Sequence, residues 1–349
     1  MMDYRKHLII STDNVKSALS KLEALAPDSI LFVVNERDQL LGSMTDGDIR
    51  RGLLKGLNMD SAILSFVQPH PVFIKKGSYT LRELQQYRQR NLKIIPILND
   101  EDRIIDVLNL RLQTTMLPVD ALIMAGGKGK RLLPLTENCP KPMLKVGDKP
   151  IIEYNIDRLI QHGVQTIHIS INYLGHIIEN HFGDGSAKGT SINYLKETAP
   201  MGTIGSARLL GPYDKEALLV MNSDLLTNID FIDFYNCFAD SNADMAVAAI
   251  GYHVDIPYAV FEMNGDNTVK SLMEKPRYTY YSNAGIYIIK KELLQQIPAG
   301  EPFDIPDLMN KVLTSGGKLV SYPILGYWLD IGRMTDFAKA QEDIKHINF

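Results

Sequence analysis

The sequence is poor in cysteine. It has only two, Cys139 and Cys237, and they lie far apart. Their separation is not a zinc-ligand spacing, and two cysteines do not make a disulfide framework of the kind that staples small secreted domains. So few cysteines are typical of a reducing compartment, and we expect the protein in the cytoplasm.

The sequence also lacks a strong excess of either charge and any long apolar run. Its 37 Lys and Arg residues against 41 Asp and Glu residues give a formal net charge of −4. This balance predicts neither nucleic acid nor a membrane as a partner, so any phosphate chemistry must depend on local cations. No apolar stretch approaches the roughly 20 residues that span a bilayer. The first residues, MMDYRKHLII, contain only a short apolar run, unlike a signal peptide.

What the sequence does have is a 45% apolar content, enough for a sizeable core, and a length of 349 residues that suits two domains. In its first part, residues 28–51 resemble residues 92–112. Each copy has a β-branched run, an asparagine, a charged turn and a second short apolar run. Each also follows an amphipathic stretch, at residues 15–25 and 80–90. This repeated order predicts two similar lobes packed together.

The repeat resembles a tandem pair of CBS domains, the module named after cystathionine β-synthase, over roughly residues 5–115. The stretch LLGSMTDGDIRRGL, residues 40–53, carries the resemblance. It implies an N-terminal α+β domain over residues 1–117 for regulation or assembly, and a homo-oligomer, because such pairs often associate. In the family a Thr-x-x-Asp element contacts an adenine nucleotide, and Thr45 and Asp48 match it. The alternative is that these two side chains only cap the following helix.

From Ala121 onward, short apolar stretches typical of strands alternate with helical stretches. The strand-like stretches are DALIMAGG, TIHISINY, SINYLKET and ALLVMNSD, and the helical ones are PIIEYNIDRLIQHG and GHIIENHFG. The alternation predicts βαβ units and an α/β domain over residues 118–349 with a Rossmann-like, mostly parallel sheet. Ligands bind beyond the carboxyl ends of such strands, where Gly126, Gly127 and Asp224 lie.

The stretch AGGKGKRLLPLTENCPKPM, residues 125–143, has the composition of an anion site. Its glycines and cations are Gly126, Gly127, Gly129, Lys128, Lys130, Arg131 and Lys141. The glycines let backbone N–H groups approach an anion without a Cβ in the way. A Walker loop is excluded because Lys130 is followed by Arg131 instead of Ser or Thr. A dinucleotide fingerprint is excluded because Leu132 stands where its third glycine would be. A basic surface turn is the plainer alternative.

The same stretch resembles the signature of the sugar-1-phosphate nucleotidyltransferases, or nucleoside-diphosphate-sugar pyrophosphorylases. The match continues in the family's order to about residue 335, through FGDGS, PMGTIGSA, MNSD, MEKP, NAGIY and WLDIG. It implies an enzyme that transfers the nucleotidyl group of a nucleoside triphosphate (NTP) to a sugar 1-phosphate, with release of pyrophosphate. A catalytically silent sensor that binds adenine nucleotide and sugar nucleotide is the alternative from another class of protein.

The resemblance also implies roles for charged residues in these motifs. The glycine loop and Arg131 would hold the triphosphate, and Arg131 would neutralise the departing pyrophosphate. Lys141 would bridge the α-phosphate and the incoming phosphate. Positioning and charge neutralisation are what phosphoryl transfer needs most. Asp224 and Asp330 would bind Mg²⁺, an ion that prefers carboxylate and phosphate oxygens.

A second group of residues is assigned to the sugar by the resemblance. Glu274 and Lys275 match the family's Glu-Lys-Pro element, in which the Glu accepts sugar hydroxyls and the Lys contacts the sugar phosphate. Asn283 and Gly285 would complete the sugar pocket. Ala259 stands where the family usually has glycine, which puts a methyl group close to the expected sugar.

Glu197, in the stretch ETAPMGTIGSA, bears on the choice of base. It lies five places before Gly202, where members of the family read the base edge and thymidylyl and uridylyl members commonly have Gln. A carboxylate can accept both the N1–H and the exocyclic amine of guanine, whereas uracil and thymine offer one donor between two carbonyls. We therefore expect GTP. Thymidylyl, uridylyl or cytidylyl transfer is the rival, and a solvated charge at a strand end is the plain alternative.

The sugar stays open among mannose, glucosamine, N-acetylglucosamine and heptose 1-phosphates. Guanylyltransferases with an N-terminal CBS pair resemble enzymes of nonulosonic acid pathways. That architecture suggests an amino-sugar 1-phosphate as substrate and a product that serves as a glycan or nonulosonic acid precursor.

Overall fold

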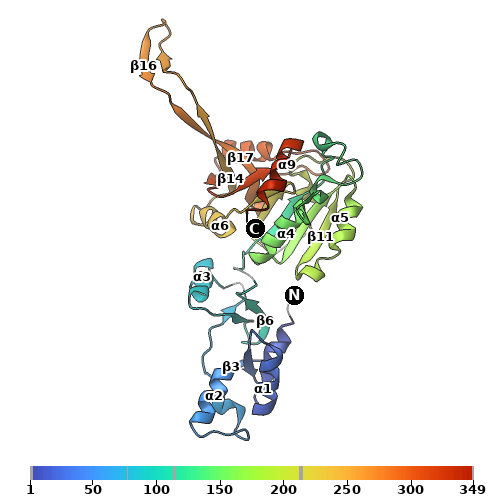
Figure 1. Cartoon of the computed structure of the whole chain (residues 1–349), viewed down its shortest axis with the longest axis vertical. Helices are drawn as coiled ribbons and strands as arrows, with labels where there is room; N and C mark the ends of the chain where they lie inside the picture. Colours follow the sequence, from blue (N-terminus) through green and yellow to red (C-terminus); the bar gives the residue numbers. More distant parts are fainter. Residues whose placement is uncertain (1–2, 77, 113–114, 212–214, 348–349) are drawn as a thin grey trace. The chain divides into compact units, whose positions relative to one another are not determined.

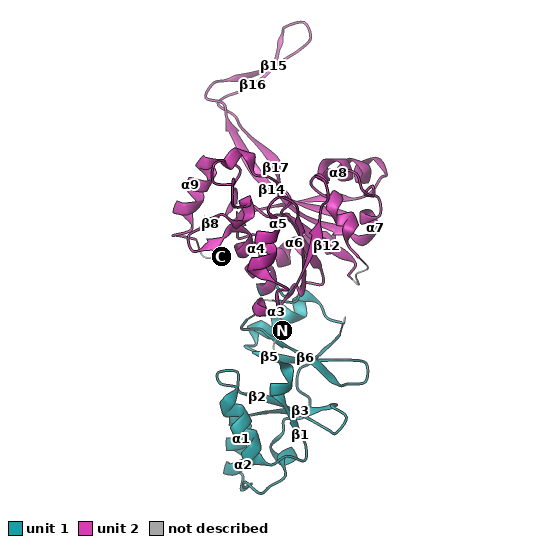
Figure 2. Cartoon of the chain, turned by 90° about the vertical axis from the view of Figure 1, so that its right-hand side faces the viewer, with its two compact units in different colours: residues 1–116, 161–163 teal, residues 117–160, 164–349 magenta. Residues whose placement is uncertain are grey.

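The computed structural model describes residues 3–76, 78–112, 115–211 and 215–347. The chain divides into two compact units (Figures 1 and 2). Unit 1 consists of residues 1–116 and 161–163, and unit 2 of residues 117–160 and 164–349. Within the described ranges no helix is both long and apolar enough to cross a membrane.

Unit 1 contains two three-stranded sheets with the same plan. In each sheet the first strand pairs in parallel with the second, and the second pairs antiparallel with the third. The sheets are β1 (Leu8–Ile10), β2 (Ile30–Val34) and β3 (Leu40–Thr45), and β4 (Ile74–Lys75), β5 (Ile94–Leu98) and β6 (Ile104–Asn109). The helices are α1 (Val15–Ala24), α2 (Asp46–Leu54) and α3 (Leu81–Gln89), with 3-10 turns at Tyr4–His7 and Ile63–Phe66. The shared plan corresponds to the repeat in the sequence.

Helix α1 illustrates how these lobes are packed. Its buried residues Val15, Ala18 and Leu22 recur every three to four positions and therefore share one face of the helix. They pack on Leu31 and Val33 of β2, which alternate along the strand and point to the same side of the sheet. The amphipathic pattern of the sequence is thus what builds this core.

Unit 2 is built on a seven-stranded sheet with the order β11-β10-β7-β12-β17-β14-β18. Of these described strands, only β17 runs antiparallel to its neighbours, β12 and β14, and the other pairs are parallel. The strands are β7 (Asp120–Met124), β10 (Thr166–Ile171), β11 (Ser191–Lys196), β12 (Ala217–Asn222), β14 (Met245–Asp255), β17 (Arg277–Lys290) and β18 (Leu319–Pro323). The predicted α/β class with a mostly parallel sheet is confirmed.

The described helices of unit 2 are α4 (Ile151–Gln161), α5 (Gly175–Phe182), α6 (Phe231–Asp240), α7 (Lys291–Leu294), α8 (Ile305–Thr314) and α9 (Met334–Asp343). Helix α8 packs its buried Ile305, Leu308 and Val312 in the same cluster as Leu218 and Val220 of β12. The intervening residues of β12 are also fully buried, so both faces of the strand are covered. A strand covered on both faces is apolar without alternation, as ALLVM is here.

Smaller pairs and turns complete unit 2. The pairs are β8 (Lys145–Val146) with β9 (Lys149–Pro150) and β13 (Leu225–Thr227) with β19 (Trp328–Asp330), both antiparallel. Short 3-10 turns lie at Lys130–Leu132, Lys141–Met143, Ser186–Lys188 and Gly205–Leu209. The register of β13 with β19 sets Leu225 opposite Asp330. Two segments about a hundred residues apart therefore meet at one place.

Strands β14 and β17 extend beyond the sheet as a long ribbon (Figure 1). The ribbon continues as β15 (Val260–Met263) and β16 (Val269–Met273), which pair antiparallel. We call residues 250–283 the arm. The structure describes all of these residues, and none of them is buried.

Candidate active site

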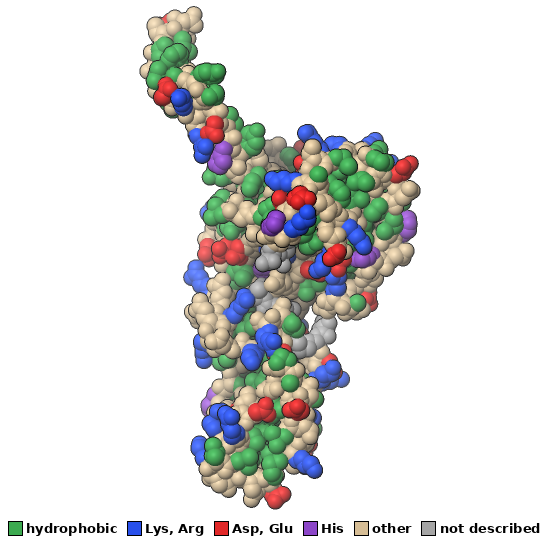
Figure 3. Space-filling view, in the orientation of Figure 1, with side chains coloured by type: hydrophobic (Ala, Val, Ile, Leu, Met, Phe, Trp, Pro, Cys, Tyr) green, Lys and Arg blue, Asp and Glu red, His purple; other side chains and the backbone are tan. Residues whose placement is uncertain are grey.

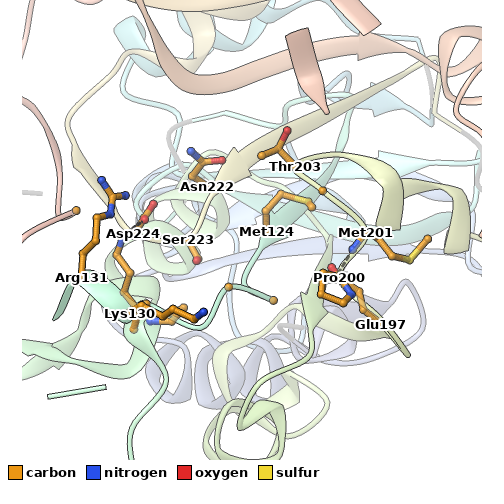
Figure 4. A pocket seen from close by; sticks show the side chains of 17 residues that line it. Met124, Lys130, Arg131, Glu197, Pro200, Met201, Thr203, Asn222, Ser223 and Asp224 are labelled. Atoms are coloured by element: carbon orange, nitrogen blue, oxygen red, sulfur yellow. Dashed lines mark hydrogen bonds and ion pairs between the residues drawn. The ribbon is translucent and has the colours of Figure 1, made fainter. Parts of the chain in front are cut away.

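A cavity of about 450 Å³ lies beyond the carboxyl ends of β7 and β12 (Figure 4). The predicted site residues among those that line it are Gly126, Gly127, Gly129, Arg131, Lys141, Glu197, Gly202 and Asp224. In Figure 4, Glu197 lies with Pro200 at one end of the cavity, and Arg131 lies near Asp224 at the other. The cavity therefore has a cation-rich end, where Asp224 also lies, and a separate end that carries Glu197.

Two glycines after β7, Gly126 and Gly129, are required by close contacts. Gly129 has a φ of +59°, and a Cβ there would lie 3.0 Å from the Cβ of Lys141. A Cβ on Gly126 would lie 3.0 Å from both carboxylate oxygens of Glu197. The loop is further fixed by the Thr136 hydroxyl, which donates to the carbonyl of Gly129 at 2.9 Å. Only glycine lets the loop pass this close to Lys141 and Glu197.

At the cation-rich end, Lys141 lies between two carboxylates. Its Nζ donates to Oδ2 of Asp224 and lies 3.9 Å from Oδ1 of Asp330. The pairing of β13 with β19 brings the two acids together, because Leu225, next to Asp224, lies opposite Asp330. Burial raises the pKa of the Asp330 carboxyl, and the charge of Asp224 raises it further, against the opposing effect of Lys141 and Arg131.

These carboxylates fit a divalent cation. Oδ1 of Asp224 and Oδ1 of Asp330 are buried, and neither has a hydrogen-bond partner among the described residues. Buried carboxylate oxygens without partners are rare, and they are the ligands that Mg²⁺ prefers. No group of three or more His, Cys, Asp or Glu side chains with metal-site geometry exists in the described part of the chain. A site with two carboxylates suits Mg²⁺, which usually takes its remaining ligands from water and substrate phosphates.

At the other end of the cavity, Glu197 is half-buried and turned toward the loop of residues 198–201. Its Oε2 accepts from the backbone N of Met201 at 3.4 Å. Burial raises the pKa of the Glu197 carboxyl, while hydrogen bonds from Met201, Ser170 and Ser206 act against that rise. The backbone carbonyl of Glu197 accepts from the Asn172 side chain at 2.9 Å, which holds the end of β11 in place.

Three polar residues that line the cavity were not singled out from the sequence: Thr203, Asn222 and Ser223. Asn222 ends β12, and Ser223 follows it directly before Asp224. Their place next to Asp224 is the feature of the sequence that could have indicated them. Thr203 had no local signal. It depends on Asp304, whose Oδ1 accepts from the backbone N of Thr203 at 2.8 Å and from its hydroxyl at 3.0 Å.

The predicted sugar residues fall into two groups. Asn283 and Gly285 lie beside the cavity, because a Cβ on Gly285 would be 2.6 Å from Nδ2 of the cavity-lining Asn222. Gly285 has a φ of +74°, and its N–H donates to the Asn283 side chain at 2.9 Å.

The second group, Ala259, Glu274 and Lys275, lies on the arm. Glu274 and Lys275 are exposed, and Ala259 is partly exposed. None of the three is among the described residues that line the cavity. Their assignment to the sugar therefore stays a prediction, and the chain alone does not bring them to the cavity in this structure.

Thr45 and Asp48, in unit 1, form a capping box at the start of α2. Oδ2 of Asp48 accepts from the Thr45 backbone N at 2.9 Å and from its hydroxyl at 2.6 Å. Its Oδ1 accepts from Arg51 at 2.6 Å and from Gln68 at 2.9 Å. The structure thus shows the capping contacts, and the predicted contact with an adenine nucleotide stays a prediction.

A comparison with family models matches residues 120–347 to the family described as nucleotidyl transferase. The chain belongs to that family. A mannose-1-phosphate guanylyltransferase of Mycobacterium tuberculosis is 29% identical over 231 residues, which cover 65% of this chain and 64% of the relative. A UTP–glucose-1-phosphate uridylyltransferase of Synechocystis is 27% identical over 239 residues, which cover 63% of this chain and 62% of the relative. The chain thus spans less than two thirds of the length of these relatives.

Among solved structures, one from Bacillus anthracis matches unit 2 in fold. Its TM-score is 0.54 at 24% sequence identity, and the match covers 66% of this chain and 97% of that one. The family match begins at β7 and takes in the sheet, the arm and the cavity. The cavity described above therefore lies within the part of the chain that the family shares.

Proposed function

We propose that the chain transfers the nucleotidyl group of an NTP, with GTP preferred, to a sugar 1-phosphate. A phosphate oxygen of the sugar 1-phosphate bonds to the α-phosphorus of the NTP as the bond from that phosphorus to its bridging oxygen breaks. Pyrophosphate leaves and an NDP-sugar remains. The observation that carries this proposal is the convergence of Lys141, Asp224 and Asp330 at the end of the cavity that Arg131 also lines.

The cations of the cavity have distinct tasks in this reaction. In the free protein, the ammonium of Lys141 is bonded to Asp224. A bound NTP presents phosphate oxygens that compete for this ammonium, and Lys141 then holds the α-phosphate and the incoming phosphate together. Arg131 neutralises the departing pyrophosphate. Cations aimed at the charge that develops in the transition state lower the barrier, whereas uniform binding of the substrate does not.

Asp224 and Asp330 are the residues that would hold Mg²⁺. The ion, when bound, supplies positive charge to phosphate oxygens and a template for their arrangement. Removal of divalent cations by a chelator is expected to abolish turnover and leave the near-ultraviolet circular dichroism unchanged, and added Mg²⁺ should restore activity. Full turnover in excess chelator would contradict this assignment.

The preference for GTP rests on Glu197. Its carboxylate lies at the end of the cavity away from the phosphate-binding cations, where the base of a bound NTP would be. Ionised, it accepts both donors on the guanine edge. The test is pyrophosphate release with each of the four NTPs, for the wild type and Glu197→Gln. GTP should be the best substrate of the wild type, and the variant should lose that preference. An unchanged preference in the variant would remove the argument.

For the sugar, an amino-sugar 1-phosphate is the first candidate, since the predicted architecture suggests it. A panel of glucosamine, N-acetylglucosamine, mannose and heptose 1-phosphates with GTP, read by mass spectrometry of the NDP-sugar, identifies the substrate. Product from mannose or heptose alone would reject the amino-sugar candidate and leave the reaction class intact.

Unit 1 is, in this proposal, a tandem CBS pair with Thr45 and Asp48 as contacts to an adenine nucleotide. The shared plan of its two sheets supports the pair. The nucleotide has to compete with the cap, because both oxygens of Asp48 already accept hydrogen bonds. Calorimetry with AMP and ATP tests the site. Absence of binding to the wild type would leave the cap as the function of these two residues.

A further inference from the structure

The arm has one apolar face with nothing packed on it. In β15 and β16, Phe261 lies opposite Leu272, and Met263 lies opposite Val269. Phe261 and Met263 share one side of the ribbon because side chains alternate along a strand, and Leu272 and Val269 share it as their partners, with the β-bulge between them. The exposed fractions of Phe261, Met263, Leu272 and Val269 are 54%, 49%, 56% and 54%. Figure 3 shows apolar side chains along the projecting arm. The exposure of these side chains is therefore a property of a whole face of the ribbon.

The opposite face of the same ribbon is mixed: Val260 lies opposite Met273 there, next to a polar group that is internally paired. Glu262 accepts from Lys270 at 2.6 Å and from the Ser271 hydroxyl at 2.9 Å. A β-bulge beside Glu262 lets both Lys270 and Ser271 face its carboxylate. An isolated two-stranded hairpin is marginally stable in water, and it becomes stable when a third layer covers its apolar face. The four exposed apolar side chains of the first face thus predict a covering surface on that side.

The arm also carries residues of the proposed site away from the cavity. Its base, at Asn283, lies beside the cavity. Glu274 and Lys275 lie farther along, between β16 and β17, and are exposed. Lys275 has a φ of +44°, in the left-handed region that non-glycine residues seldom occupy. Such backbone outliers cluster at functional sites, where the surrounding structure holds them.

The arm is tied to the sheet in its extended direction. The ladder between β14 and β17 continues without interruption from Ala249–Asn283 to Asp255–Arg277. At its outer end, the guanidinium of Arg277 donates twice to the carboxylate of Asp255, at 2.6 and 3.2 Å. Folding the arm back onto its own cavity would break this ladder. A second molecule can receive the arm without any loss of it.

Unit 2 also has exposed apolar side chains that follow cavity-lining residues in the chain. Leu133 and Met334 each lie two residues beyond a cavity-lining residue, Arg131 and Gly332 respectively. Their exposed fractions are 55% and 45%. Exposed apolar side chains of this kind complement the apolar face of the arm.

We propose that two copies of the chain exchange arms, so that Glu274 and Lys275 of each copy complete the sugar-phosphate end of the other copy's cavity. This inference rests on the proposed function, because it takes the role of these two residues from it. The exchange is two-fold symmetric: each copy gives an arm and receives one, and the contact closes on itself. It covers the apolar face and brings Glu274 and Lys275 to a cavity that is not lined by these residues of its own chain.

Complementation between two inactive variants tests the exchange. Lys275→Ala and Asp224→Asn are co-expressed with different affinity tags, and the mixed oligomer is isolated on both tags in turn. With exchanged arms, the copy with intact Asp224 receives the intact Lys275 of its partner, so one site of two is complete. Turnover of about half that of the wild type is then expected. If each arm served its own cavity, no site would be complete, and activity would stay at the level of the single variants.

Two control oligomers give the activities expected for no complete site and for one complete site. A mixed oligomer of Asp224→Asn with Arg131→Ala, both on the body of unit 2, should show no recovery in either arrangement. A mixed oligomer of Asp224→Asn with Lys270→Ala should show about half of the wild-type activity in either arrangement. The reason is that Lys270 bonds to Glu262 within the arm and has no place in the site. A wild type that is monomeric at the assay concentration, or an isolated mixed oligomer without recovery, would overturn the exchange.

A second measurement does not depend on activity. Lys275 is replaced by the photo-crosslinking residue p-benzoylphenylalanine, and the irradiated protein is separated on a denaturing gel. Exchange predicts a product of twice the chain mass that contains a peptide from residues 125–143 of the other copy. Only monomer-sized product would overturn it. If the wild type turns over no NTP with any sugar 1-phosphate, the proposed function fails, and this crosslink alone decides whether arms are exchanged.

Discussion

At the scale of single residues, Lys141 is the side chain on which the site depends most. It holds two carboxylates of like charge together, with a side chain only 12% exposed. Lys141→Ala should lower kcat by about 100-fold or more, which is the usual effect of removing one group that stabilises transition-state charge. The thermal midpoint should also fall, because the change leaves two carboxylates of like charge without the cation between them. Undiminished turnover in a folded variant would refute the role.

Glu197 gives a prediction about pH. Burial raises the pKa of this carboxyl above the ordinary value of 4.5. The ionised form is the one that accepts both guanine donors, so kcat/KM for GTP should fall as the pH drops through the raised pKa. For stability the effect is opposite: the folded state holds the proton more tightly, so the free energy of unfolding falls as the pH rises from 4.5 through the folded pKa.

The measurement is kcat/KM for GTP against pH in the wild type and in Glu197→Gln. The acid limb due to this group should be absent from the variant, because an amide does not titrate. Profiles of the same shape in both proteins would mean that another group governs the acid limb and that Glu197 does not read the base.

A substitution at Gly127 tests whether a side chain there would clash with a bound ligand and not with the protein itself. No heavy atom of the described residues lies within 4 Å of the place where its Cβ would be, although the residue lines the cavity. Gly127→Ala should therefore leave the thermal midpoint unchanged and raise KM for the NTP at least about tenfold, since a methyl group would block the backbone's approach to phosphate. An unchanged KM would show that the triphosphate lies elsewhere.

Gly126→Ala is the matched comparison. Its Cβ would meet the Glu197 carboxylate at 3.0 Å even without a ligand. Here the free protein has to adjust as well, so both the thermal midpoint and KM for GTP should change. Equal behaviour of the two variants would mean that the contact with Glu197 has no effect.

At the scale of elements, helix α8 connects the core to the site. Its buried face packs in the main cluster of unit 2, and Asp304, directly before its first residue, holds Thr203 in the cavity wall. Leu308 is fully buried, whereas Leu313 on the same helix is 56% exposed. Leu308→Ala should lower the free energy of unfolding by about 2–5 kcal/mol. Leu313→Ala should change it by less than about 0.5 kcal/mol.

The free energy of unfolding of both variants is measured from the fluorescence of Trp328 in denaturant. Trp328 is the single tryptophan of the chain, and its indole N–H donates to the Ala284 carbonyl at 2.8 Å inside unit 2. Equal losses of stability in the two α8 variants would contradict the packing described for this helix.

Most parallel strands and the glycine loop could be predicted because their signals are local. Alternation of strand-like and helical stretches indicated β7, β10 and β12, and the composition of residues 125–143 indicated an anion site. The meeting of Asp224 with Asp330 had no such signal, since it depends on the register of β13 with β19. Only the resemblance to a family could suggest it from the sequence.

At the scale of the whole molecule, the chain divides into two units, and residues 161–163 belong to the first of them. The domain boundary expected near residue 118 stays a prediction. The arm could not be foreseen from the sequence. Its alternating sequence is consistent with a hairpin, but a strand pattern does not specify which surface covers the hairpin. Residues assigned to the sugar by their motif, Glu274 and Lys275, are therefore found away from the cavity of their own chain.

The central claim is that one cavity, with Lys141 and Asp224 at one end and Glu197 at the other, transfers a nucleotidyl group to a sugar 1-phosphate, with Asp330 3.9 Å from the ammonium of Lys141. Mass spectrometry of the wild-type protein incubated with GTP, Mg²⁺ and a panel of sugar 1-phosphates tests it most directly. The account predicts one GDP-sugar, formed in an amount equal to the pyrophosphate released. Intact GTP after incubation with every sugar 1-phosphate, from a protein whose fold is verified, would contradict it.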